Sequence, residues 1–325
     1  MGKSFLSLLA ALLLTTSSVA LACEPCALFN AAMLRGHSAG NFTFSISEQF
    51  TEFDRSEELE ENSIRDGELV RSYSTTQFAL GYDISESWGV QATLPFIVRH
   101  FDEIKRYRAD TKEDAGIGDM YVTASYLPLN IKNVEWSLLG GVIGGLKLPT
   151  GDTGVLGDVS REEGPEERRL FKHHPVGSST GGRALTFGSG SLDYLVGINV
   201  LGRYQKTLIL ADAQYTFRTE GDYDYEFADD LLWSIAAGYY IFLEDESTVA
   251  VTAAISGDHK EQDELAGADV PGSQFSNIYV GPQLLFTLND RISGLAAVEF
   301  RTGGSDQGSF IVPDVRYNLS LSYLF

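Results

Sequence analysis

The sequence has no long apolar segment. In its 325 residues, no stretch offers about 18 uninterrupted apolar residues, the length that a membrane-spanning helix needs. A transmembrane helix is therefore excluded. Any membrane span must then be a closed β-barrel, the other structure in which all backbone polar groups are paired.

Basic residues and histidines are also scarce. The chain carries 24 lysines and arginines against 45 carboxylates, a balance that argues against a nucleic-acid partner. The chain has only five histidines, and the sequence predicts no enzyme and no cofactor. The adjacent His173 and His174 have two interpretations, a metal site or solvated side chains in a charged loop, and we favour the second.

Only two cysteines occur, Cys23 and Cys26, in the motif C-E-P-C. A local disulfide is the favoured interpretation in an exported chain. A redox or soft-metal site joined by Met33 and His37 is an alternative. Lipid attachment at Cys23 is disfavoured, because Leu21 is one position away from where a lipobox has its leucine.

The N-terminus has the form of a secretory signal peptide. Lys3 supplies the positive start, residues 5–14 the short apolar run, and Ala20-Leu21-Ala22 a cleavage site. We therefore expect three parts: a signal peptide at 1–22, a periplasmic segment with the C-x-x-C motif at 23–40, and a β-barrel at 41–325.

The final stretch, residues 315–325, shows the pattern that the rest of the chain repeats. Its apolar and polar residues alternate strictly, as in a strand with one greasy and one polar face. The chain ends on Tyr323 and Phe325 in the manner of the signal that barrel-insertion machinery recognises in bacterial outer-membrane barrels. The alternative is the last strand of a secreted β-sandwich.

The alternation predicts about 12 strands. We expect them at about 41–53, 68–83, 88–101, 116–127, 134–148, 187–201, 207–218, 228–243, 247–257, 275–288, 292–302 and 315–325. Short turns follow the even-numbered strands and long loops follow the odd-numbered ones, including a charged loop at 102–115 and the longest at 149–184. A sandwich has no reason to sort its connectors by length, whereas outer-membrane barrels have short periplasmic turns and long outer loops. The predicted fold is thus all-β, a single antiparallel transmembrane barrel in the cell outer membrane.

The same alternation assigns the lumen. If Tyr194, Val196 and Phe217 face lipid, their polar neighbours face inward. The expected pore-lining residues are Gln91, Lys147, Asp193, Asn199, Asp212, Gln214, Arg218, Glu299, Arg301 and Arg316. Their mixed charges either select solutes by a transverse field or pair and fill the interior, and we favour a narrow channel. The segment at 149–184 either plugs the lumen or caps it.

Short motifs in a fixed order support this fold. They are G-x-G-D at 116–119, L-K-L-P-T-G-D at 146–152, G-S-G-S-x-D-Y at 188–194 and G-D-Y-D-Y-E-F at 221–227. Over residues 75–325 the chain resembles the transporter-like outer-membrane barrels named for the MetA pathway of phenol degradation. The resemblance implies a barrel and the uptake of aromatic compounds. The motif aspartates themselves are expected to cap turns at the barrel rim.

Two functions follow as expectations. The first is a channel or transporter that passes small solutes, aromatic or hydrophobic ones among them, by passive diffusion, with outer-membrane lipid and the solute as partners. The alternative is a structural or assembly barrel whose N-terminal C-x-x-C docks or exchanges electrons or metal with a periplasmic partner.

Overall fold

The computed structural model describes residues 39–52, 67–105, 108–154, 186–270, 273–306 and 315–325. The predicted signal peptide, Cys23 and Cys26, and His173 and His174 lie outside this part of the chain. Among the described residues, no helix is both long and apolar enough to cross a bilayer.

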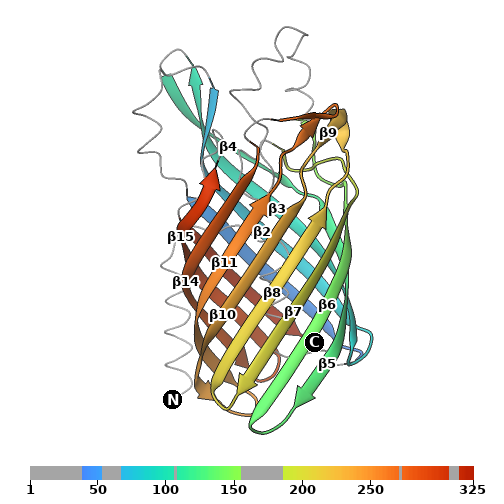
Figure 1. Cartoon of the computed structure of the whole chain (residues 1–325), viewed down its shortest axis with the longest axis vertical. Helices are drawn as coiled ribbons and strands as arrows, with labels where there is room; N and C mark the ends of the chain where they lie inside the picture. Colours follow the sequence, from blue (N-terminus) through green and yellow to red (C-terminus); the bar gives the residue numbers. More distant parts are fainter. Residues whose placement is uncertain (1–38, 53–66, 106–107, 155–185, 271–272, 307–314) are drawn as a thin grey trace.

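The described chain consists mainly of long antiparallel strands, which Figure 1 shows tilted around the axis of one barrel. Their bounds are β1 Phe42–Glu52, β2 Gly67–Asp83, β3 Trp88–Lys105, β4 Arg108–Ile117, β5 Met120–Lys132, β6 Trp136–Leu148, β7 Asp193–Tyr204, β8 Thr207–Phe217, β10 Asp230–Leu243, β11 Thr248–Lys260, β14 Phe275–Leu288, β15 Ile292–Asp306 and β16 Val315–Leu324.

The sheet closes on itself. Apart from β4, each of these strands pairs with the next one along the chain, and β1 pairs with β16 from Thr43 opposite Leu324 to Glu52 opposite Val315. β4 pairs only with β3, so the closed ring contains the other 12 strands. The prediction of an antiparallel barrel of about 12 strands is confirmed.

The predicted loop at 102–115 is wrong. β3 continues to Lys105 and β4 begins at Arg108, and together they form a hairpin that projects beyond the ring in Figure 1. The alternating apolar pattern ends where the wall leaves the apolar belt, but the backbone ladder continues without it, because its hydrogen bonds need no apolar side chain.

The connectors confirm the predicted asymmetry. At one end of the barrel the strands are joined by the short segments 84–87, 133–135, 205–206, 244–247 and 289–291. Asn289 and Asp290 have φ of 51° and 52°, the left-handed conformation that a tight hairpin turn requires and that Asn and Asp tolerate. The described parts of the long connectors, 149–154, 186–192, 218–229, 261–270 and 273–274, lie at the other end, which we call the loop end.

The barrel wall has an apolar outer face and a largely polar inner one. Along β7, Tyr194 and Val196 are each 48% exposed, whereas Asp193 and Asn199, on the opposite face of the strand, are buried. Outward aromatic pairs lie at the turn end, such as Trp88 stacked on Tyr126 with ring centroids 4.6 Å apart. Such girdles mark the interface between lipid and water in outer-membrane barrels.

A second, small sheet lies at the loop end. It contains β9 (Tyr225–Glu226), β12 (Glu264–Leu265) and β13 (Ala268–Asp269), and the 3-10 turn η2 (Asp222–Asp224) precedes it. We call this sheet the cap. Tyr225, Phe227 and Val270 form its buried core.

The carboxylate of Asp263 holds the cap to β11. It accepts hydrogen bonds from the Tyr225 hydroxyl at 2.7 Å and the Ala228 amide at 2.8 Å, and it forms an ion pair with Lys260 at 2.5 Å. Burial, followed by the charge of Asp263, raises the pKa of Tyr225 well above its usual value. Tyr225 therefore remains a hydrogen-bond donor at any physiological pH.

Candidate functional site

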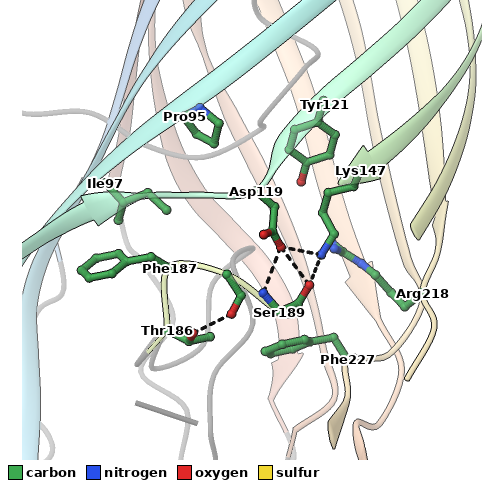
Figure 2. A pocket seen from close by; sticks show the side chains of 11 residues that line it. Pro95, Ile97, Asp119, Tyr121, Lys147, Thr186, Phe187, Ser189, Arg218 and Phe227 are labelled. Atoms are coloured by element: carbon green, nitrogen blue, oxygen red, sulfur yellow. Dashed lines mark hydrogen bonds and ion pairs between the residues drawn. The ribbon is translucent and has the colours of Figure 1, made fainter. Parts of the chain in front are cut away.

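Three of the sequence motifs meet inside the loop end of the barrel, at the carboxylate of Asp119 (Figure 2). Its Oδ1 accepts hydrogen bonds from the amides of Thr150 and Gly151 at 3.1 and 2.9 Å. Its Oδ2 accepts the amide and hydroxyl of Ser189 at 2.9 and 2.8 Å. One aspartate thus fastens the turn after β6 to the segment that leads into β7.

A chain of buried ion pairs continues from Asp119 across the inner wall. Lys147 Nζ lies 2.9 Å from Asp119 and 2.7 Å from Asp193. Arg218 lies 3.1 Å from Asp193 and 2.5 Å from Asp230. Asp119 directly precedes β5, Arg218 directly follows β8, and the other three side chains come from β6, β7 and β10. Their charges alternate, so each buried charge has an opposite neighbour.

A second charged cluster lies toward β16. Arg316 forms an ion pair with Asp258 and lies over the ring of Tyr279, 3.6 Å from its centroid. Asp258 also accepts a hydrogen bond from Asn277 at 2.7 Å. Arginine combines the two contacts because its planar guanidinium stacks on an aromatic ring while its edge donates to a carboxylate.

Close backbone packing brings the segment before β7 into the barrel. An added Cβ at Gly188 would lie 2.5 Å from the carbonyl carbon of Gly151, so neither position has room for a side chain. The ring of Phe187 lies against Gly116 and 5.2 Å from the guanidinium of Arg99. These contacts explain why the motifs are rich in glycine.

A cavity remains beneath Phe187, as Figure 2 shows. Its lining includes the apolar Pro95 and Ile97 and the charged Asp119, Lys147 and Arg218. The cavity measures about 30 Å³, room for about two water molecules. The side chains around Asp119 therefore leave only a small free space between them.

All ten predicted pore-lining residues lie on the inward face of the wall. Lys147, Asp193 and Arg218 join the first cluster, and Arg316 lies in the second. Three others form side-chain hydrogen bonds: Asp212 with Ser234 at 2.6 Å, Gln91 with Thr93 at 3.1 Å and Glu299 with Ser256 at 2.7 Å. The remaining three are Asn199, Gln214 and Arg301. Inward placement is consistent with a pore-lining role, which remains a proposal.

The alternation argument missed several partners of these residues. Asp119 stands in a quoted motif, yet only turn capping was expected of it, and it also binds Lys147. Asp258 and Lys260 lie beyond the predicted end of their strand at residue 257, and β11 extends to Lys260. Pairing between strands depends on register, which alternation within one strand does not reveal.

No described group of three or more histidine, cysteine or carboxylate side chains is arranged to hold a metal ion. The carboxylates of the first cluster are instead neutralised by Lys147 and Arg218.

No family model matches the chain, and no curated protein matches it by sequence. Among solved structures, 130 chains match. An outer membrane channel from Pseudomonas putida F1 has a TM-score of 0.54 at 9% identity, over 89% of this chain and 96% of that one. The β domain of the Bordetella autotransporter BrkA has a TM-score of 0.42 at 10% identity, over 89% and 99%. A mutant of the monoaromatic hydrocarbon channel TodX has a TM-score of 0.40 at 11% identity, over 95% and 96%. At such identities the likeness establishes the outer-membrane barrel fold alone.

Proposed function

We propose that the chain is a passive outer-membrane channel for small solutes. The observation that carries this proposal is the two-faced wall of a closed 12-strand ring, with an apolar outer face and an inner face on which charged, amide and hydroxyl side chains predominate. Lipid covers the first kind of face in membrane barrels, and an aqueous lumen meets the second. A barrel that served only as an anchor would be more stable with an apolar interior.

The two charged clusters would form the narrowest part of this channel. They lie near the loop end of the wall, where Lys147, Asp193 and Arg218 are all buried. Mixed charges at a constriction admit small neutral solutes more readily than ions, because an ion must shed its hydration there.

We also propose membership of the transporter-like family that the motifs resemble. The support is their convergence: residues 118–119, 150–151 and 188–189 contact one another through Asp119. The fourth motif joins them, since the amide of Asp222 donates a hydrogen bond to the carbonyl oxygen of Ser189 at 3.3 Å. Motifs that share one site are constrained as a set, as residues of a family signature are.

Single-channel conductance of the refolded protein tests the channel. We would record the full-length chain and a variant that lacks residues 155–182, which leaves Asp152 and Thr153 in place. Steady conductance of the full-length protein supports a channel. Conductance after the deletion alone would make the removed segment a plug. Silence in both forms would overturn the proposal and favour the assembly barrel, with the C-x-x-C at Cys23 and Cys26 as its docking point.

We propose no enzymatic activity, although one contact deserves an assay. His100 lies between Ser72, with Oγ 3.4 Å from Nδ1, and Glu113, with Oε2 2.9 Å from Nε2. The serine contact is long for an activated nucleophile. Glu113, the residue that would orient the histidine, is 63% exposed. Ser72 and His100 are opposite each other in the β2–β3 ladder, so strand pairing alone accounts for their contact. Lipase turnover by the purified protein that is lost in S72A would contradict this.

A further inference from the structure

The inner wall carries a patch of hydrogen-bond acceptors that nothing in the described chain satisfies. The amide oxygens of Gln49, Gln77 and Asn318 and the hydroxyls of Thr51 and Ser320 are buried without a hydrogen-bond partner. Gln49 and Gln77 are 3% and 1% exposed. We call these five residues the acceptor patch.

The patch is continuous across three neighbouring strands. Gln49 on β1 is directly opposite Asn318 on β16, and Gln77 on β2 is opposite Ser47 on β1. Ser47 is in turn opposite Ser320. Residues opposite each other in an antiparallel pair have adjacent side chains, so the five polar groups form one surface near the middle of the wall.

This surface destabilises the folded state. A buried acceptor without a donor has lost its hydrogen bond to water and gained none in the protein, and native proteins rarely leave one unpaired. Here several lie together, whereas Ser45 and Ser322 nearby satisfy each other at 2.7 Å. An unpaired group in a folded protein calls for an explanation such as a bound molecule.

An apolar cluster lines the inner wall from the opposite side round to the neighbour of β16. Leu201 on β7, Leu208 and Leu210 on β8, Leu285 on β14 and Leu295 on β15 belong to it. β8 is half a turn of the ring away from β1, and in Figure 1 the yellow β8 lies in the near wall and the blue β2 in the far wall.

The apolar cluster borders the acceptor patch. Leu295 and Ala297 on β15 belong to the cluster and are directly opposite Ser320 and Asn318 on β16. A molecule at this level would therefore touch both the apolar wall and the acceptor patch.

We propose that this level of the lumen binds neutral solutes that have an apolar body and at least one O–H or N–H donor. The donor would bind Gln49 and Gln77, and the body would lie on the leucine wall. Along β1 and β2 the site favours neutral over ionised solutes, because the described inward residues of β1 at 43–51 and of β2 at 73–79 carry no charge to replace lost hydration. This inference rests on the proposed channel function and narrows its substrate class.

Benzyl alcohol and its methyl ether are suitable probes, because they share an apolar ring and differ by one donor. Binding is measured in detergent from the rise of the unfolding midpoint with ligand concentration, since a ligand at free concentration L stabilises the folded protein by RT ln(1 + L/Kd). One hydrogen bond predicts that the alcohol binds about 3- to 10-fold more tightly than the ether. In Q49L and Q77L this ratio falls toward one.

A matched control is available in Gln283, which is also inward on β14 but already accepts a hydrogen bond from Thr252 at 3.2 Å. Q283L should therefore keep the preference for the alcohol. Folding of each variant is checked by the heat-dependent shift of the barrel on an electrophoresis gel. Gln-to-Leu changes at the patch remove an unpaired acceptor, so they are expected to fold.

Conductance of the same samples separates the two proposals. Alcohol preference with conductance supports both, and alcohol preference in a silent protein keeps the binding site and rejects the channel. Conductance with equal alcohol and ether affinity overturns the binding site alone, since water would then satisfy the patch. Equal affinities in a silent protein overturn both.

Discussion

At the residue scale, single carboxylates determine how the loop end is assembled. Asp119 accepts three backbone amides and pairs with Lys147, so it does the work of a turn cap and of a counter-ion. The capping role is predictable from the G-x-G-D motif. The ion pair is not, because Lys147 is 28 positions away along the chain and meets Asp119 only through the pairing of β5 with β6.

We expect K147M to destabilise the barrel by about 3–5 kcal/mol, because it leaves Asp119 and Asp193 buried with less opposite charge. The free energy of unfolding by urea in detergent measures the effect. K206M is the matched control, since Lys206 is exposed in a turn and its loss should change stability by less than about 0.5 kcal/mol. Equal stabilities of the two variants would contradict a buried ion-pair network.

We expect G188A to cost about 1–3 kcal/mol, the usual effect of overpacking, since its Cβ would lie 2.5 Å from the backbone of Gly151. G144A provides the comparison, because an added Cβ there meets nothing within 4 Å. The unfolding midpoints of the two variants in detergent test this. A G188A barrel as stable as G144A would show that the two segments do not pack as closely as described.

At the element scale, polar strands at the loop end were the hardest to predict. The β3–β4 hairpin is charged, and β7 starts at Asp193 rather than near 187, because the preceding residues turn inward to Asp119. Sequence periodicity depends on one buried face. It therefore located the strands of the apolar belt closely and failed where hydrogen bonds and side-chain polarity shape the chain instead.

The cap places like charges opposite each other: Glu226 faces both Glu264 and Glu220. Burial, followed by these two carboxylates, raises the pKa of Glu226. A raised pKa means that the cap is most stable with Glu226 protonated, and that this contribution disappears as pH rises through that pKa.

E226Q should therefore stabilise the cap near neutral pH, by a few tenths of a kcal/mol because the side chain is largely solvated. Amide-exchange protection factors over residues 222–228 at pH 7 would report the gain. The difference from wild type should vanish at acidic pH. A gain independent of pH would mean that charge is not its cause.

At the scale of the whole molecule, the net charge of −21 is the dominant feature. A negative potential around a pore concentrates cations. We expect a conducting barrel to prefer cations in a gradient of potassium chloride, most strongly near 0.1 M salt. The preference should fall toward 1 M, as the screening length shrinks from about 10 Å to about 3 Å. A cation preference that does not change with the salt concentration would contradict an origin in the long-range potential of the protein.

Sequence alone thus predicted the closed barrel, which connectors are short turns and which are long loops, and which face of each strand points inward. Alternation is a property of each strand, so Asp193 and Arg316 were assigned to the interior without any knowledge of their neighbours. Their partners Arg218 and Asp258, and the acceptor patch, depend on which strands lie side by side and in which register. The chain pattern does not contain that information.

The seam between β1 and β16 has a consequence for the time course of folding. Its partners, such as Thr43 and Leu324, are the most distant pair along the described chain, whereas most other seams join strands that are neighbours in sequence. Bringing distant segments together carries the largest loop-closure entropy. The pairing of β1 with β16 is therefore expected to form last, and it closes an open curved sheet in which these two strands are the free edges.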